Sequence, residues 1–295
     1  MIKILVTGGA GQLANCIADV SLGYNSQMDF IYRSSIDLDI TDLKAVNKEF
    51  ETGSYDFCIN CAAYTHVDGA ETNPFLADSV NRIGAKHLAH ASAKNNTVFI
   101  HISTDFVFDG SKNLPYHEED EPRGLSAYGT SKLLGEKEIA RAWKKHFIIR
   151  TSWLYSEYGH NFMKSMLKYG NERDELSIVY DQIGTPTYAK DLASVVLLLI
   201  ERNIQSYGTY HYSNEGVASW YDFAMAIFEI NQITVAVNAI RTDAYPLPAK
   251  RPSYSVLDKN KIKELLAIQI PYWRNSLVKA SDRYQKNTLV TLKNK

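Results

Sequence analysis

The chain has 295 residues, of which 45% are hydrophobic and 22% are charged, and its formal net charge is −1. A charge this close to zero removes the electrostatic attraction that nucleic-acid binding needs, and the longest apolar stretch, 192–200, is far shorter than the ~20 residues that cross a bilayer. Only three cysteines are present, which excludes a disulfide scaffold. From these features together we expect a cytoplasmic protein that binds neither nucleic acid nor membrane.

The first half of the sequence alternates short apolar runs with longer helical patterns. Strands are predicted over 2–6, 30–32, 57–61, 98–102 and 147–149, and helices over 12–22, 42–50 and 127–143, with a further helix beginning at Asn73 and Pro74. Strands and helices that alternate in this way form right-handed βαβ units. We therefore expect an α/β protein with a doubly wound parallel sheet over residues 1–150.

After Arg150 the alternation loosens, and aromatic residues, glycines and prolines become more frequent. Short elements are still predicted, over 176–179, 189–201, 209–212, 220–228 and 273–284. We interpret residues 151–295 as a smaller α/β substrate-binding lobe. Some of its elements are expected to return to the parallel sheet, so the boundary near residue 150 is soft.

A glycine-rich turn follows the first predicted strand, where Gly8 to Ala14 reads G-x-x-G-x-x-A. Gly8 permits a tight turn, Gly11 lets the backbone approach a pyrophosphate, and the amides that open the next helix attract its negative charge. Any strand-to-helix turn can use glycine. The order strand, glycines, helix nevertheless favours a Rossmann-type dinucleotide site over a plain turn.

The residues after the second predicted strand bear on the choice of cofactor. An NAD enzyme commonly has Asp or Glu there for the ribose hydroxyls, whereas this chain has Arg33, Ser34 and Ser35. A guanidinium and two hydroxyls suit a 2′-phosphate better. The pattern favours NADPH, with NADH as the alternative, and the competing interpretation makes Arg33 a solvated surface residue.

Tyr128 and Lys132 are four residues apart at the start of a predicted helix, which places them on one helical face. A nearby ammonium is expected to lower the tyrosine pKa from about 10, toward general acid–base chemistry. Thr104 and Asp105 follow the fourth predicted strand, at the sheet edge where ligands bind, and Thr104 offers a hydroxyl to a substrate carbonyl. Taken alone, Thr104 and Asp105 also suit a loop cap and an Asx turn.

With these residues the chain resembles the extended short-chain dehydrogenases/reductases, and within them the dTDP-4-dehydrorhamnose reductases. The resemblance covers nearly the whole length. Its glycine and Tyr/Lys motifs are shared by a wide superfamily, whereas its last two segments are much more specific. The matching segments are Gly8–Ala14, Asn60–Asp68, Ser103–Gly110, Tyr128–Lys132, Arg150–Trp153, Asp181–Thr187 and Arg251–Leu257.

The resemblance implies NADPH-dependent reduction of the C4 ketone of dTDP-4-dehydro-L-rhamnose to dTDP-L-rhamnose. It implies that Tyr128 protonates the alkoxide, that Lys132 tunes Tyr128 and binds ribose, and that Thr104 bonds the ketone oxygen. The motifs and the resemblance together predict these residues for the cofactor: Gly8, Ala10, Gly11, Gln12, Leu13, Arg33, Asp39, Ile40, Ala62, Ala63, Tyr64, Tyr128 and Lys132. Those it implies for the sugar nucleotide are Thr104, Asp105, Trp153 and Arg251, where Arg251 either pairs with the diphosphate or forms a structural ion pair.

One departure from the family pattern concerns metal binding and assembly. Family members are described with a magnesium ion that bridges glutamates between subunits. Asn15 and Lys190 stand here where acids would be needed. We therefore predict no metal site and leave a homodimer open.

Rival functions use the same scaffold. A nucleotide-sugar 4,6-dehydratase would need an acid after Asp105, where this chain has Phe106, so elimination is disfavoured. A 4-epimerase, or a reductase of another nucleotide-linked 4-keto-6-deoxy sugar, stays open. A non-catalytic NADP-binding regulatory subunit, such as that of methionine adenosyltransferase, is disfavoured because Thr104, Tyr128 and Lys132 are all present.

Overall fold

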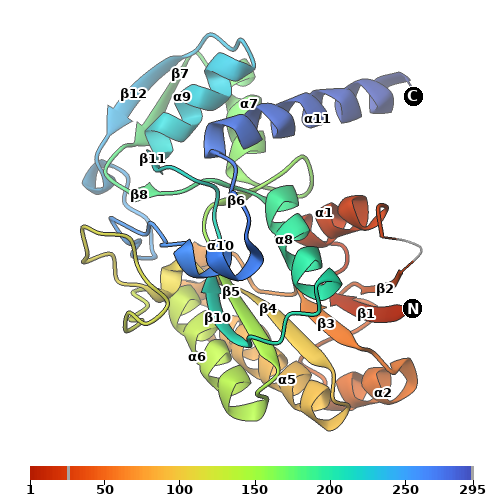
Figure 1. Ribbon diagram of the computed structural model, residues 1–295. Helices are drawn as coiled ribbons and strands as arrows, with labels where there is room; N and C mark the ends of the chain where they lie inside the picture. Colours follow the sequence, from red (N-terminus) through yellow and green to blue (C-terminus); the bar gives the residue numbers. More distant parts are fainter. Residues whose placement is uncertain (25–26, 294–295) are drawn as a thin grey trace.

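A parallel sheet of six strands forms the centre of the molecule (Figure 1), in a computed structural model that describes residues 1–24 and 27–293. Its strand order is β10-β5-β4-β3-β1-β2. The strands are β1 (Ile2–Thr7), β2 (Met28–Arg33), β3 (Phe57–Asn60), β4 (Val98–Thr104), β5 (His146–Thr151) and β10 (Gly208–His211). This architecture confirms the expected doubly wound, Rossmann-type α/β fold.

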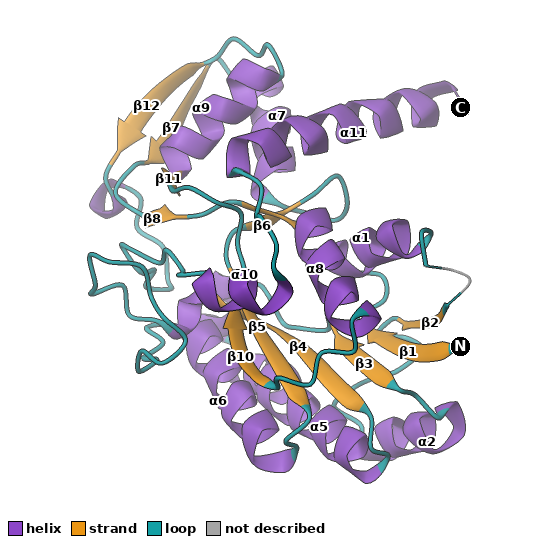
Figure 2. Ribbon diagram, in the orientation of Figure 1, coloured by secondary structure: helices purple, strands orange, loops and turns teal. Residues whose placement is uncertain are grey.

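Helices cover both faces of the sheet (Figure 2). One layer holds α1 (Gln12–Ser21) and α8 (Ala189–Glu201), and the other holds α2 (Leu43–Gly53), α5 (Ala85–Lys94) and α6 (Ala127–Ala142). Successive residues of β1 alternate between the two cores: Ile4 and Val6 pack under α1 and α8, and Leu5 packs toward α2 and α5. Helices therefore exclude water from both faces of the sheet, which explains why the strand sequences are continuous apolar runs.

The connection from β3 to β4 contains more separate helical segments than predicted. It contains α3 (Val67–Thr72), α4 (Pro74–Asp78) and a π-helical turn, η1 (Ser79–Gly84), before α5 begins. Asn73 caps α4 by accepting a hydrogen bond from the Leu76 amide at 3.2 Å, as its type and position predict. The single helix expected from Asn73 is thus interrupted at η1.

The second lobe has a separate core, in which Tyr155, Met163, Phe223 and Leu277 are buried together. Figure 1 shows it beyond the carboxyl ends of the sheet strands. Its elements are β6 (Leu154–Tyr155), α7 (Phe162–Glu172), β7 (Glu175–Val179), β8 (Ile183–Gly184), β9 (Thr187–Tyr188), β11 (Ala218–Ser219), α9 (Trp220–Ile230), β12 (Ala236–Ile240), η3 (Thr242–Ala244) and α11 (Trp273–Lys293). By contrast, α10 (Asn260–Leu266) buries Ile262 and Leu266 in the core of the central sheet. None of the helices in the described ranges combines the length and apolarity that crossing a membrane requires.

A buried ion pair joins β4, β5 and α6. Arg150 of β5 donates from Nη2 to Glu136 Oε2 of α6 at 2.7 Å, and the two side chains are only 6% and 5% exposed. Arg150 Nε also donates to the same carboxylate, and Ser103 Oγ donates to Glu136 Oε1 at 2.5 Å. Removing one member of such a pair leaves the other charge buried without a partner.

We expect Glu136→Ala to reduce the free energy of unfolding by about 3–5 kcal/mol, because the Arg150 guanidinium would stay buried and uncompensated. Urea denaturation measures this change. Glu121→Ala is the matched control, because Glu121 pairs with Arg123 at 3.1 Å but both side chains are well exposed. The control should change stability by less than about 1 kcal/mol, and equal midpoints for the two variants would contradict the prediction.

Candidate active site

The turn after β1 has the shape of a phosphate-binding turn. Gly8 has a φ of +66°, and a Cβ there would lie 2.6 Å from the backbone nitrogen of Ala62. Gly11 precedes α1, and no side chain of the described residues caps that helix. The first amides of α1 are therefore free to bind an anion, and the residues of this turn suit the pyrophosphate of a dinucleotide.

The residues in and after the turn differ in exposure and in contacts. The side chain of Leu13 is buried in the sheet core, which leaves only its backbone for a cofactor. Gln12 reaches the second lobe: its Nε2 donates to the Leu154 carbonyl at 3.2 Å, and its Oε1 accepts from Asn161 at 2.7 Å. Ala10 is exposed at the tip of the turn. Of the predicted cofactor residues, Gln12 is thus the one that also ties the two lobes together.

Arg33 ends β2 directly beside the glycine turn, because its carbonyl accepts a hydrogen bond from the Gly9 amide at 2.8 Å. Its Nε donates to Glu49 Oε1 at 3.0 Å, and its side chain is 37% exposed. Glu49 also accepts a hydrogen bond from the Tyr55 hydroxyl. This pairing raises the pKa of Arg33 and orients the guanidinium while leaving part of it open to solvent. Arg33 is therefore more ordered than the surface interpretation implies.

The residues predicted to contact the rest of the cofactor lie on two neighbouring loops. Ala62, Ala63 and Tyr64 follow β3, and Ala62 packs against Gly8. Ile40 is buried against Gly84, whereas Asp39 is exposed. Sequence reasoning missed Asn81 in η1, whose side chain accepts from the Tyr64 amide at 2.9 Å and donates to the Tyr64 carbonyl at 3.0 Å. No spacing or motif pointed to that contact.

The predicted catalytic hydroxyls meet at the carboxyl end of β4. Thr104 closes the strand, and its Oγ1 donates to Asp105 Oδ1 at 3.1 Å. Its hydroxyl is also near enough to Tyr128, in the first turn of α6, to lower the pKa of that phenol. Ser126 caps that helix by accepting from the Gly129 amide at 3.1 Å. The fold thus brings Thr104, Asp105 and Tyr128 into one cluster.

Asp105 is the unusual acid of this cluster. It is almost wholly buried, and burial raises its pKa to about 6. Its Oδ1 accepts from Thr104, while its Oδ2 has no hydrogen-bond partner among the described residues. A buried carboxylate oxygen without a partner is costly, so it marks a place where a ligand hydroxyl would be bound favourably.

The structure corrects the expected effect of Lys132 on Tyr128. Burial raises the pKa of Tyr128 to about 12, with the nearby Thr104 hydroxyl acting in the opposite direction. Lys132 does not offset this, because its Nζ turns to the Ile102 carbonyl at 2.6 Å and lies 3.1 Å from His101 Nε2. Tyr128 is therefore a protonated phenol at neutral pH, the form that an acid requires.

His101 is a second residue that sequence reasoning missed. It lies in the middle of β4, within an otherwise apolar run, and is 1% exposed. Complete burial lowers its pKa well below the usual value, so the ring is neutral. A lone histidine in a strand carries no spacing signal, so only the three-dimensional contact with Lys132 reveals its position at the site.

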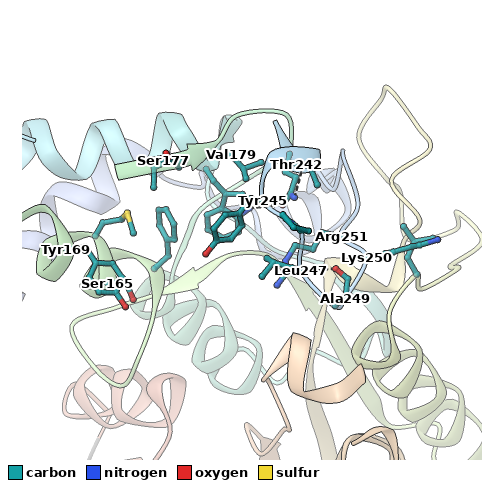
Figure 3. A pocket seen from close by; sticks show the side chains of 17 residues that line it. Ser165, Tyr169, Ser177, Val179, Thr242, Tyr245, Leu247, Ala249, Lys250 and Arg251 are labelled. Carbon is teal, nitrogen blue, oxygen red and sulfur yellow. Dashed lines mark hydrogen bonds between the residues drawn. The ribbon is translucent and has the colours of Figure 1, made fainter. Parts of the chain in front are cut away.

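A pocket of about 580 Å³ lies in the second lobe (Figure 3). Ser165 and Tyr169 of α7 lie across it from Leu247 and Arg251, as Figure 3 shows. Aromatic and polar side chains are among those that line it: Phe162, Tyr169, Trp220, Tyr245, Gln182 and Arg251. Such a mixture suits a ligand with a flat ring and a charged group.

Two predicted substrate residues are at or beside this pocket. Arg251 lines it but is also paired with Asp68 of α3, its Nη2 lying 2.7 Å from Oδ2. The structural ion pair considered for Arg251 is therefore formed. Trp153, at a φ of +46°, stacks on the pocket residue Trp220 with ring centroids 3.6 Å apart.

The positions considered for a shared metal hold other partners. Asn15 donates to the Gly11 carbonyl at 2.8 Å, and Lys190 pairs with Asp19 at 2.9 Å. Arg283 contacts the same Asp19 carboxylate at 3.1 Å. Within residues 1–24 and 27–293 there is no group of three or more His, Cys, Asp or Glu side chains that could hold a metal ion.

Comparison with known proteins gives consistent matches. The family model described as the RmlD substrate binding domain matches residues 2–286. The dTDP-4-dehydrorhamnose reductase of Aggregatibacter actinomycetemcomitans is 41% identical over 287 residues, covering 94% of this chain and 97% of the relative. The spore coat polysaccharide biosynthesis protein SpsK of Bacillus subtilis is 40% identical over 279 residues, covering 94% of this chain and 96% of the relative.

Solved structures agree with these matches. The dTDP-4-dehydrorhamnose reductase of Clostridium acetobutylicum is 44% identical with a TM-score of 0.92, covering 96% of this chain and all of that one. The Bacillus anthracis dTDP-4-dehydrorhamnose reductase, solved in complex with NADP, is 37% identical with the same TM-score and coverage. A UDP-glucose 4-epimerase of Thermus thermophilus, 17% identical, shares the fold alone. The chain therefore belongs to the family of dTDP-4-dehydrorhamnose reductases.

Proposed function

We propose that this protein is an NADPH-dependent oxidoreductase that reduces the C4 ketone of dTDP-4-dehydro-L-rhamnose to give dTDP-L-rhamnose. The observation that carries the proposal is the buried Tyr128 hydroxyl, held protonated near Thr104 at the ligand edge of the sheet. The names and the coverage of the relatives support the same reaction.

The side chains supply what a ketone reduction needs. NADPH, when bound, supplies the hydride that adds to C4 of the sugar. Thr104 polarises the ketone oxygen with its hydroxyl, and Tyr128 donates a proton to the alkoxide that forms there. One hydride and one proton convert the ketone to an alcohol and leave Tyr128 as a phenolate to be reprotonated. Lys132, one turn further along α6, binds the ribose of the cofactor.

The proposed cofactor site follows the strand ends from β1 to β4. The backbone of Gly8, Ala10, Gly11, Gln12 and Leu13 holds the pyrophosphate, and the free amides of α1 support this role. Arg33 binds the 2′-phosphate through the exposed part of its guanidinium. The remaining proposed contacts come from Asp39, Ile40, Ala62, Ala63 and Tyr64.

The proposed substrate site joins Asp105 and Trp153 to the pocket of Figure 3. Asp105 accepts a hydrogen bond from a sugar hydroxyl at its unpartnered Oδ2. Arg251 binds the diphosphate and exchanges its Asp68 partner for the phosphate oxygens, both of which suit a guanidinium fork. The aromatic side chains around the pocket suit a nucleobase.

The proposed location is the cytoplasm. Cys16, Cys58 and Cys61 are free thiols, and burial raises the pKa of Cys16 and Cys61 to about 12. Free, protonated thiols of this kind suit a reducing compartment. The proposed partner is a dTDP-sugar, and a homodimer stays a prediction.

The first prediction of this proposal concerns turnover. The protein should oxidise NADPH in stoichiometric amounts when given dTDP-4-dehydrorhamnose, followed by the loss of nicotinamide absorbance. Tyr128→Phe should lower kcat by about 10²- to 10⁴-fold, because it removes the proton donor and keeps the ring. NADPH binding by Tyr128→Phe, measured by calorimetry, should stay within about threefold of the parent protein.

Two outcomes would contradict this assignment. Unchanged turnover by a folded Tyr128→Phe protein would remove Tyr128 from the acid role. Conversion of a nucleotide sugar without net NADPH loss would indicate a 4-epimerase, because such an enzyme regenerates its nicotinamide cofactor.

A second prediction concerns cofactor preference. Arg33→Ala should weaken NADPH binding by roughly 10- to 100-fold, because it removes charge-assisted hydrogen bonds worth about 1.5–3 kcal/mol. NADH binding is the internal control and should hardly change, because NADH lacks the 2′-phosphate. Equal losses for the two cofactors would show that Arg33 supports the fold rather than the phosphate.

A third prediction concerns pH. With saturating NADPH, kcat/KM for the sugar nucleotide should fall as the pH drops through about 6, because protonation removes an acceptor at Asp105. Asp105→Asn should be slower at pH 8 and should lack this acid limb. An identical limb in the variant would assign the titration to another group.

A further inference from the structure

The guanidinium of Arg33 is shared between a protein carboxylate and solvent. Its Nε donates to Glu49 Oε1 of α2 at 3.0 Å. Within residues 1–24 and 27–293, neither Nη1 nor Nη2 donates a hydrogen bond to the protein, and 37% of the side chain is exposed. Arg33 can therefore bind an anion through its two terminal nitrogens, but only beside a carboxylate that is already in place.

Tyr55 fixes the position of Glu49. The Tyr55 hydroxyl donates to the same Oε1, and the Tyr55 ring is 5% exposed and packs edge-on against Phe50 of α2, with ring centroids 5.9 Å apart. A Cβ at Gly53, the last residue of α2, would collide with this ring, so the ring and the helix are in close contact. The Glu49 side chain is itself only 15% exposed. When an anion approaches Arg33, Glu49 therefore cannot swing away without breaking a partly buried hydrogen bond.

A second carboxylate acts on the same guanidinium from the loop after β2. Asp37 Oδ2 accepts hydrogen bonds from the Ser34 amide at 2.9 Å and from the Ser34 hydroxyl at 2.7 Å. These hydrogen bonds lower the pKa of Asp37, and the charge of Arg33 acts in the same direction. The hydroxyl of Ser34, one of the two that suit a 2′-phosphate, is thus already donated to an acid.

The charges around Arg33 attract a phosphate less than an isolated guanidinium would. Arg33 is the one cation in the described part of the chain within ion-pair distance of Glu49, and with Asp37 nearby the three side chains sum to a negative charge. A phosphate monoester carries a charge of about −1.5 to −2 at pH 7. A 2′-phosphate would therefore gain bonds to Arg33 but be repelled by the carboxylates, whereas an uncharged 2′-hydroxyl would not be repelled.

We propose that Glu49 is a specificity-determining residue whose carboxylate, fixed beside Arg33, limits the preference of the protein for NADPH over NADH. This inference rests on the 2′-phosphate role proposed for Arg33 and deepens it. Arg33 attracts the phosphate, and the charge of Glu49 opposes that attraction without acting on NADH. The site therefore accepts both cofactors.

Glu49→Gln removes the charge and keeps the contacts. Both hydrogen bonds to Glu49 end on Oε1, and an amide oxygen can accept two, so glutamine can retain both. Calorimetry with the cofactor alone should show NADPH bound roughly tenfold more tightly by Glu49→Gln, with NADH binding within about twofold of the parent protein. A gain of less than about threefold for NADPH, or a loss, would overturn the proposal, because Glu49 would then act only by orienting Arg33.

Salt separates a charge effect from a change in shape. The advantage of Glu49→Gln over the parent protein in NADPH binding should shrink toward one in about 1 M NaCl, where charges are screened beyond ~3 Å. An advantage that is independent of salt would rule out the electrostatic origin that the proposal requires.

Glu51, two residues further along α2, provides the matched control. It pairs with Lys94 at 2.7 Å, and both side chains are more than half exposed. Glu51→Gln changes the net charge by the same amount and should leave the affinities for NADPH and NADH within about twofold of the parent values. An equal gain in NADPH binding by Glu51→Gln would contradict the assignment to Glu49, because net charge alone would then explain the effect.

The parent protein supplies a test that needs no variant at Glu49, should Glu49→Gln fail to fold. At low salt the parent protein should bind NADPH no more than about tenfold more tightly than NADH, and a larger preference would overturn the proposal. Selective loss of NADPH binding in Arg33→Ala, with no gain in Glu49→Gln, would reject this inference and leave the role of Arg33 intact. No sugar nucleotide enters these measurements, so failure of the proposed reaction would be recognised separately.

Discussion

The buried carboxylate of Glu136 is the constraint on which the site depends. It lies on α6 in line with Tyr128 and Lys132, because residues four apart share a helical face. Its bonds to Arg150 of β5 and Ser103 of β4 fix how α6 is rotated against the sheet. Ser103 directly precedes Thr104, so the same contacts bring the hydroxyls of Thr104 and Tyr128 together. A pair of this kind gains little net energy over apolar packing, but a misplaced helix would leave its charges unpaired.

The local sequence pattern predicted the elements that contain a sustained apolar run or a helical apolar period. The helix over 189–201 was predicted with its observed bounds, and the sheet strands agree to within one or two residues. The two-residue strands β6, β8, β9 and β11 were not predicted, because they exist only through pairing with distant segments. The same reason explains the interruption at η1, where Asn81 bonds to the backbone of Tyr64.

In the candidate site, too, some residues could be placed from sequence and others depend on contacts between distant segments. Thr104, Asp105 and Tyr128 could be placed together from sequence, because parallel strands end at one edge and the next helix begins there. The direction of Lys132 could not, because it depends on a histidine inside an apolar strand. The expected lowering of the Tyr128 pKa was wrong because desolvation of the phenol dominates, while the Nζ of Lys132 is engaged by the Ile102 carbonyl. Arg251 likewise has a partner, Asp68, that no spacing revealed.

The position of β10 has a consequence for how the chain is made. This strand pairs with β5 at the edge of the sheet, yet it is synthesised only after much of the second lobe. As the nascent chain leaves the ribosome, β5 keeps an open row of backbone donors and acceptors that another strand could occupy. The sheet gains its last strand only when β10 arrives, so the half that binds nucleotide cannot mature ahead of the half that follows it.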